Sequence, residues 1–394
     1  MEVLTSPPCR VVICGLLIWT SWGGTAPIVE AADPAIEAAI KKGAEHIRRQ
    51  QLQDGCWEGR GHRLGETALA GLALLAAGIP PDSPAVMAAS HGVRRLVPAN
   101  RETYEVSLAV MFLDQVGVKG DSEIIRHLGA RLADGQAANG CWTYSLHGSP
   151  GTGDNSNAQF AVLACWICRR HGAVMDNTIL KADRYFRSTV NSLDGGWGYT
   201  PGGRSTPTMT CAGLVALAAE RGMSIERSQS APAGVRKAPA RRDGPARDLT
   251  PDKNDPVVAA ALRYLAVQLR QDRVEAQSKG FAGLYFYWSL ERVGVIYGLP
   301  KIEDVDWYGW GVERLLRSQQ QDGSWDGPGC VDTAFAILFL SRANVAEDLT
   351  RVLGGSDRGS QPQRQPPDTF MRVERKPRVP AGGEPPRNKE DEAN

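Results

Sequence analysis

The stretch QQLQDGCWEG, residues 50–59, decides the fold, because near copies of it recur along the chain. The copies read AANGCWTYS at 137–145, NSLDGGWGY at 191–199 and QQQDGSWDG at 319–327. Each copy is a turn with a tryptophan, and each precedes a helix-period run of small and apolar residues, such as GETALAGLALLAAG at 65–78. Four copies of one unit indicate a structural repeat.

More polar, amphipathic helices are expected before these turns, at about 35–51, 121–135, 177–192 and 304–320. Two further helices, near 84–97 and 256–270, precede the apolar runs at 104–117 and 284–298. The apolar runs have small or apolar residues on nearly every face, so they should be buried on two sides, with the polar helices outside them. Six such pairs suffice to close a ring. The sequence therefore predicts an all-α fold, an (α/α)6 toroid over residues 33–350.

The chemistry of the turn supports this arrangement. Its glycine supplies a left-handed cap after the outer helix, and its aspartate fits the turn. Its tryptophan offers a broad apolar plate that would seal the seam between neighbouring hairpins.

Three segments stand outside the repeat. Residues 1–32 carry Arg10, an apolar run over 11–22 and a small-residue stretch ending at Ala32, which is typical of a secretory signal peptide. They predict an exported protein, periplasmic or secreted, without a transmembrane anchor after cleavage. Residues 224–255 are rich in Pro, Arg, Ala and Asp and predict a disordered insertion, and residues 351–394 predict a disordered tail.

The charge balance disfavours one class of partner, and the cysteines can be free or paired. The 394 residues include 45 Lys and Arg against 44 Asp and Glu, a balance that gives no long-range field and disfavours a nucleic-acid partner. Six cysteines follow the signal segment, and most fall in apolar helix patterns, where a free thiol behaves as a small hydrophobe. Export also permits disulfides, so the sequence leaves both states open for Cys56, Cys141, Cys165, Cys168, Cys211 and Cys330.

With QxxDGxW turns ahead of TAxAxLxL helices, the chain resembles the terpenoid cyclase and protein prenyltransferase repeat superfamily over about 36–223 and 256–346. It looks especially like exported squalene-cyclase-like proteins that share a block such as FYWSLERVGVIYGLPKIEDVDWYGWG, here 286–311. The resemblance implies the toroid, whereas activity has to be argued from individual residues.

The catalytic motif of the cyclases is incomplete in this chain. The squalene/hopene cyclases protonate an alkene with the middle Asp of a DxDDTA segment. This chain reads GCVDTA, so Asp332 matches the last Asp and Val331 stands at the general-acid position. A valine cannot supply the proton that general acid catalysis requires. The resemblance thus implies a toroid without the cyclase acid.

Metal and cofactor binding are not expected either. The protein prenyltransferases hold zinc with Asp-x-Cys and a distant His, of which Asp54, Cys56 and His62 are a local echo. However, Asp54 is the turn aspartate that recurs at Asp194 and Asp322 without a cysteine two places later, which favours a structural role.

The inner helices of such a ring run the same way, so their first residues would meet at one mouth. These residues are Glu66, Thr67, Tyr104, Glu105, Asp154, Asn155, Asn157, Thr206, Thr208, Tyr285, Tyr287, Asp332 and Thr333. Helix capping explains the Asp, Asn and Thr residues by itself. The alternative is that several of them converge on a ligand in a shared apolar cavity.

Three hypotheses follow for function. The first is that the toroid binds a small apolar or amphipathic ligand, isoprenoids included, or a protein partner. The binding residues would be Tyr104, Glu105, Asn155, Asn157, Thr208, Tyr285, Tyr287, Trp288 and Thr333. By resemblance, Tyr285, Tyr287 and Trp288 would form the aromatic wall that faces cations in the cyclases. The second is an enzyme that uses the carboxylates Asp332, Asp154 and Glu66 on a glycan or another extracytoplasmic substrate. The third is a non-catalytic scaffold with a plugged centre.

Overall fold

The computed structural model describes residues 33–147, 153–230, 255–271, 283–327 and 329–354, and these residues are mostly helical. Within these ranges there are isolated β-bridges but no strand. The predicted all-α class is therefore confirmed. The signal segment 1–32, residues 231–254 of the insertion and the tail from 355 lie outside the described residues, so those predictions stay predictions.

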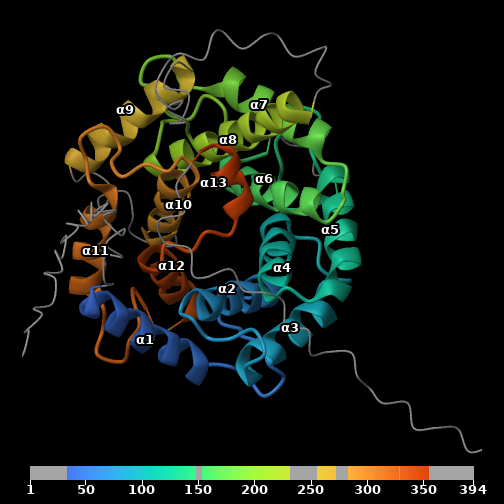
Figure 1. Ribbon diagram of the computed structural model, residues 1–394, viewed down its shortest axis with the longest axis vertical. Coiled ribbons are helices and arrows are strands. Elements are labelled where there is room, and N and C mark those ends of the chain that lie inside the picture. Colours follow the sequence, from blue (N-terminus) through green and yellow to red (C-terminus); the bar gives the residue numbers. More distant parts are fainter. Residues whose placement is uncertain (1–32, 148–152, 231–254, 272–282, 328, 355–394) are drawn as a thin grey trace, which may run out of the picture.

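Helices of two layers alternate along the chain. The outer layer consists of α1 (Pro34–Arg49), α3 (Pro84–Leu96), α5 (Ser122–Asp134), α7 (Asp176–Thr189), α9 (Pro256–Arg270) and α11 (Trp307–Ser318) (Figure 1). The inner layer consists of α2 (Arg63–Ala76), α4 (Thr103–Val116), α6 (Asn155–Arg170), α8 (Pro207–Ser230), α10 (Gly283–Ile296) and α12 (Cys330–Leu340). A short 3-10 helix, η1 (Lys119–Asp121), and a final helix, α13 (Glu347–Val352), complete the order.

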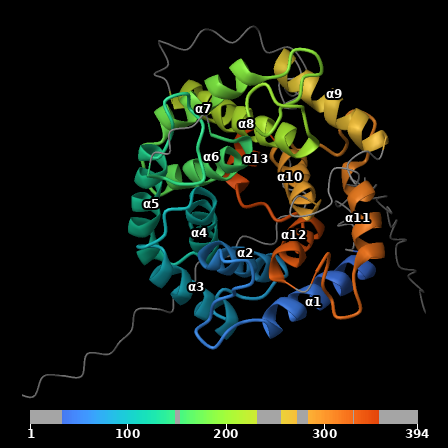
Figure 2. The same ribbon diagram turned by 180° about the vertical axis from the view of Figure 1, so that it is seen from behind.

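The inner helices contact one another in a circuit. α2 packs on α4, α4 on α6, α6 on α8, α8 on α10, α10 on α12, and α12 returns to α2. Figure 2 shows the same two layers from behind. The inner helices are buried on nearly every face because they touch both inner neighbours and an outer helix, as their small and apolar composition predicts.

The tryptophan turns join the layers in the same way each time. Every indole Nε1 donates to a carbonyl of the preceding outer helix, at 2.8 or 2.9 Å, and every indole is buried; the pairs are Trp57 to Ile47, Trp142 to Leu132, Trp197 to Phe186 and Trp325 to Leu315. A buried indole N–H needs such a partner. The turn therefore fixes how each outer helix meets the inner helix that follows.

The turn glycine is required for two reasons. In the first and last copies, Gly55 and Gly323 have φ of 84° and 94°, in the left-handed region that favours glycine. A Cβ at Gly323 would also lie 2.4 Å from the carbonyl oxygen of Lys42 in α1, and one at Gly55 would lie 2.5 Å from that of Ala88 in α3. The glycine thus lets the turn touch the next outer helix.

The last turn contacts the first helix. Gln319 Nε2 donates to the Ala39 carbonyl at 2.9 Å, and Arg49 Nη2 donates to the Asp322 carbonyl at 2.8 Å. α1 also packs on α11 and α12. The two ends of the helical series are therefore held side by side (Figure 1).

Helix α8 extends to Ser230, so residues 224–230 are helical where the sequence suggested the start of a disordered insertion. Two contacts explain the extension. Gly222 lies close against Trp166 and Leu349, and Glu226 pairs with Arg169 at 2.8 Å. Tertiary contacts thus continue a helix that its composition alone does not favour.

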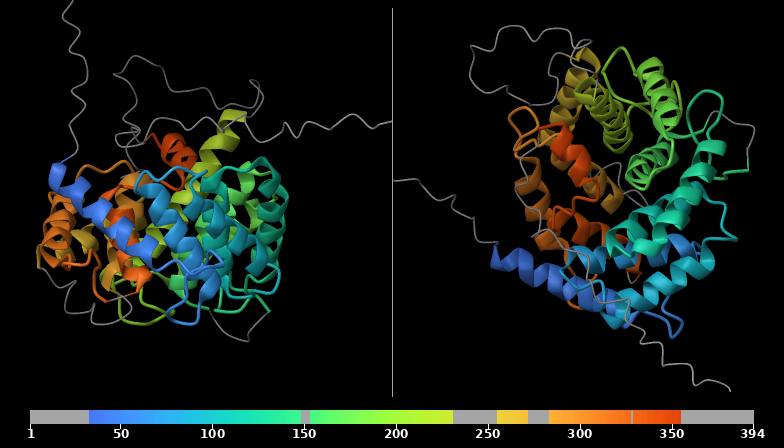
Figure 3. Two further views of the ribbon diagram at one scale, coloured as in Figure 1. Left: turned by 90° about the horizontal axis from the view of Figure 1, so that it is seen from below. Right: turned by 45° about the vertical axis from the view of Figure 1, so that its right-hand side comes forward.

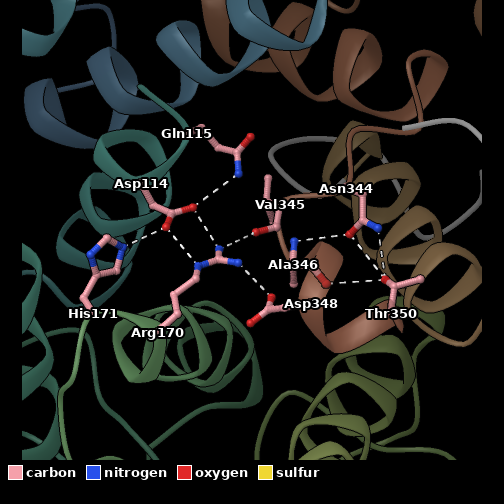
Figure 4. A network of polar contacts seen from close by, with 9 residues as sticks. All are labelled: Asp114, Gln115, Arg170, His171, Asn344, Val345, Ala346, Asp348 and Thr350. Atoms are coloured by element: carbon pink, nitrogen blue, oxygen red, sulfur yellow. Dashed lines mark hydrogen bonds and ion pairs between the residues drawn. The ribbon is translucent and has the colours of Figure 1, made fainter. Parts of the chain in front are cut away.

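A polar network holds α13 across the C-terminal ends of the inner helices (Figure 4). Arg170, the last residue of α6, pairs with both Asp114 of α4 and Asp348 of α13, each at 2.8 Å, and donates to the Val345 carbonyl at 3.1 Å. His171 reaches Asp114 as well, at 2.9 Å. α13 therefore lies next to the C-terminal end of α8, and both project beyond one end of the two layers (Figure 3, left).

Within the described ranges, none of the helices combines the length and the apolar character needed to cross a bilayer.

Candidate functional site

A cavity of about 610 Å³ lies at the N-terminal ends of the inner helices. All six contribute to its wall, through Glu66 of α2, Tyr104 of α4, Asn157 of α6, Thr208 of α8, Tyr285 of α10 and Val331 of α12, among others. The lining is mainly apolar with a few polar groups. Both the volume and the lining are those of small-molecule sites, which span about 300–1,000 Å³.

The structure brings some of the predicted site residues to the cavity and leaves others behind its wall. Those that line it are Glu66, Tyr104, Asn157, Thr206, Thr208 and Tyr285. Although all are described, Thr67, Asp154, Asp332, Glu105, Asn155, Tyr287, Trp288 and Thr333 are not part of the lining. The shared mouth therefore exists, but fewer residues border it than the sequence suggested.

Three residues of the second group hold local structure. Asp154 caps α6, because its Oδ1 accepts from the backbone N–H of Asn157 at 2.9 Å. Asn155 Nδ2 donates to the Gly198 carbonyl at 2.8 Å, and Thr333 Oγ1 accepts from the backbone N–H of Trp325 at 3.2 Å. Capping and turn contacts thus account for their places at helix starts.

The acidic residues near the mouth are each engaged by other groups. Asp332 is buried and pairs with Arg60 at 2.7 Å, and Glu66 Oε1 accepts from the Arg60 backbone N–H at 2.7 Å. Glu105 accepts from the Gly65 N–H at 2.8 Å and lies 3.3 Å from His62. Burial raises the pKa of Asp332 above its usual range in spite of the attraction of Arg60.

Two aromatic side chains of the cavity wall stack on each other. Phe160 and Tyr285 have ring centroids 5.5 Å apart and nearly parallel planes, and Phe335 closes on Tyr285 at 5.7 Å. Trp288 lies behind Phe160, at 5.0 Å, and is almost completely buried. Tyr287 points the other way, where it stacks on Trp310 of α11 at 5.4 Å. Of the three aromatic candidates, only Tyr285 therefore faces the cavity.

Several lining residues were not singled out in the sequence. Phe160 and Phe335 read there as ordinary core positions of apolar helices. Tyr144 and Tyr199 lie at the exposed rim with their hydroxyls 2.6 Å apart. A signal for these two exists, because each follows a turn tryptophan by two residues, in the copies WTY and WGY.

Glu291 and Arg292 form a fully buried ion pair on α10. Arg292 Nε donates to Glu291 Oε2 at 2.6 Å, and Nη2 donates to the Ala343 carbonyl, in the segment between α12 and α13. Neither residue borders the cavity. Burial raises the pKa of Glu291 from 4.5 to about 7, outweighing the attraction of Arg292.

This raised pKa gives a pH dependence that can be measured. The folded chain binds the Glu291 proton more tightly than the unfolded chain does. The stability that protonated Glu291 contributes is therefore fully present below about pH 4.5 and is lost as the pH rises through about 7. The free energy of unfolding of wild type, minus that of Glu291→Gln, should therefore fall by on the order of 3 kcal/mol over this range. Urea unfolding at several pH values measures the difference, and a difference independent of pH would contradict the assignment.

Asp54 and the cysteines take structural roles. Asp54 Oδ2 pairs with Arg63 and with Arg95, the latter at 2.8 Å, and the described residues include no group of three or more potential metal ligands. The six cysteines are buried, unpaired thiols in the described part of the chain. Burial raises the pKa of Cys141, Cys168 and Cys330 to about 12, so these thiols are protonated at neutral pH and unsuited to nucleophilic chemistry.

In comparisons with known proteins, no family model matches this chain, and no curated protein matches it.

Proposed function

We propose that this chain is an exported (α/α)6 toroid of the terpenoid cyclase and prenyltransferase kind, and that it binds a small apolar or amphipathic ligand, isoprenoids included, in its central cavity. The observation that carries the proposal is the mainly apolar cavity of about 610 Å³, to which all six inner helices contribute. The closed circuit of inner-helix contacts and the four alike tryptophan turns support the toroid.

Binding without cyclisation fits the residues at the start of α12. Val331, at the position of the cyclase acid, lines the cavity and offers only methyl groups to a ligand. The neighbouring carboxylate of Asp332 is paired with Arg60 and lies outside the lining. A general acid has to reach the reacting carbon, and neither residue supports such a role.

The open cavity favours a ligand over a scaffold with a plugged centre. A volume of about 610 Å³ is far larger than the few water-sized voids that close-packed interiors contain. The carboxylates Asp154 and Asp332 offer no support for glycan hydrolysis, because each is occupied by a cap or an ion pair and neither borders the cavity.

Narrowing the cavity should weaken ligand binding. In Val331→Phe the larger ring would project into the apolar space, because Val331 lies on the cavity wall. We expect the wild type to bind the fluorescent probe N-phenyl-1-naphthylamine, and we expect Val331→Phe to weaken binding by at least tenfold, about 1.4 kcal/mol. Fluorescence titration measures both dissociation constants, with farnesol as competitor.

The matched control is Val267→Phe, the same substitution at an exposed position of the outer helix α9, which should leave binding unchanged. Thermal unfolding of both variants would separate lost binding from lost folding. Absence of probe binding by the wild type, or cyclisation of squalene by it, would overturn the proposal.

A further inference from the structure

One hydrogen-bond acceptor on the cavity wall lacks a partner. Asn157 lines the cavity and is only 2% exposed, yet its Oδ1 accepts no hydrogen bond from any residue that the structure describes. Buried polar atoms are nearly always paired, and an orphaned one is costly. A buried, unpaired acceptor on a residue of the cavity wall therefore points to a donor on the occupant.

The direction of this acceptor is fixed by Asp154. Asn157 Nδ2 donates to Asp154 Oδ2 at 2.9 Å, while the Asn157 backbone N–H donates to Asp154 Oδ1 at 2.9 Å. Turning the amide over would place its oxygen against the carboxylate, two acceptors facing each other. Oδ1 is thus held away from Asp154.

The residue before Asn157 carries a hydroxyl. Ser156, the preceding residue, also lines the cavity, and its Oγ makes only a long contact of 3.3 Å to the Tyr285 hydroxyl. That tyrosine gives its own proton to Gln159 Oε1 at 2.8 Å. Ser156 can therefore turn its proton toward a ligand, so that two consecutive residues of a mainly apolar wall supply one acceptor and one donor.

We infer that the cavity takes an apolar alcohol whose hydroxyl donates to Asn157 Oδ1 and accepts from Ser156 Oγ; this inference rests on the proposed function. A hydroxyl carries one donor and accepts as well, which matches the pair. An ammonium group brings three donors and a charge, and burying a charge at Asn157 and Ser156, where only one unpaired acceptor stands, is unfavourable. The inference thus names the polar end of the ligand as neutral.

Three ligands with the same chain test the inference by displacement of N-phenyl-1-naphthylamine. Farnesol has the donor, farnesyl methyl ether keeps the oxygen without the donor, and farnesylamine is charged. We expect the wild type to bind farnesol at least about tenfold more tightly than the ether, because the ether leaves Asn157 Oδ1 buried and unpaired. Farnesylamine should bind more weakly than farnesol.

The variant Asn157→Leu should bring the ratio of the two dissociation constants close to one while the ether keeps its wild-type affinity. Retained ether binding shows that the cavity is intact. If this variant does not fold, Ser156→Ala serves instead: it should weaken the binding of farnesol and of its ether alike by several fold, because both oxygens accept from Ser156 Oγ, and unchanged affinity for both would contradict the inference.

The outcomes separate the two claims. Equal affinity of the wild type for farnesol and its ether, or tighter binding of farnesylamine, would overturn the inference and leave the proposed function standing. Failure of the probe and of all three ligands to bind would sink the proposed function itself.

Discussion

Replacing Arg292 with methionine is expected to lower the free energy of unfolding by about 3–5 kcal/mol, because it leaves the carboxylate of Glu291 buried without its counter-charge. Both side chains are completely buried, and the guanidinium also donates to the Ala343 carbonyl, which would lose its donor. The packing volume changes little, so the loss would report the buried charge. Urea unfolding at pH 8, above the pKa of about 7 that Glu291 has beside Arg292, measures it.

The double variant Glu291→Leu, Arg292→Met provides the control. Removing both charges together should recover most of the stability, because an apolar pair of similar volume no longer pays the desolvation of two ions. Arg317→Met, at an exposed i,i+4 pair with Glu313, should change the free energy of unfolding by less than about 0.5 kcal/mol. If the double variant were as unstable as the single one, the loss of stability would come from packing and not from the buried charge.

The pairing of Glu291 with Arg292 also shows where sequence reasoning fails. Buried ions need a partner, but the sequence alone does not say which residue supplies it. In the structure the two neighbours pair with each other, and Arg292 also donates to the carbonyl of Ala343, in the segment after α12. No local pattern places Ala343 beside α10, so this contact was beyond prediction.

The helices and turns were predictable because their signals are local. Apolar periodicity identified every inner helix, and the turn glycine and tryptophan marked where the outer helices α1, α5, α7 and α11 end. The candidate site was predictable only in part, because a position at a helix start does not say which way the side chain points. Tyr285 and Tyr287 make this concrete. Residues two apart lie on opposite sides of a helix, so both could not face one cavity.

The same limit applies to the acidic candidates. The sequence marked Asp154 both as a capping residue and as a site candidate. Only the structure shows that both oxygens of its carboxylate accept hydrogen bonds from Asn157. Val331, in contrast, was identified by comparison with a motif, and it does line the cavity. A residue type missing from a known motif is visible in a sequence, whereas the direction of a carboxylate is not.

Replacing Trp325 with alanine is expected to cost about 3–5 kcal/mol of the free energy of unfolding, as for other buried tryptophans. Its indole is completely buried, and its N–H donates to the Leu315 carbonyl at 2.8 Å. Its ring also lies against Gly43 of α1, where an added Cβ would come within 2.7 Å of Cζ3. The substitution should therefore loosen the contact between the last turn and the first helix.

Hydrogen exchange distinguishes this effect from a general loss of stability. In Trp325→Ala the amides of α1, Pro34–Arg49, should lose protection before those of the other outer helices. Trp142→Ala removes an equivalent indole, bonded to the Leu132 carbonyl, and should cost a similar free energy while sparing α1. If α1 lost no more protection in the first variant than in the second, the seam between the two ends of the helical series would not depend on Trp325. The contacts of Gln319 and Arg49 across that seam would then have to hold it alone.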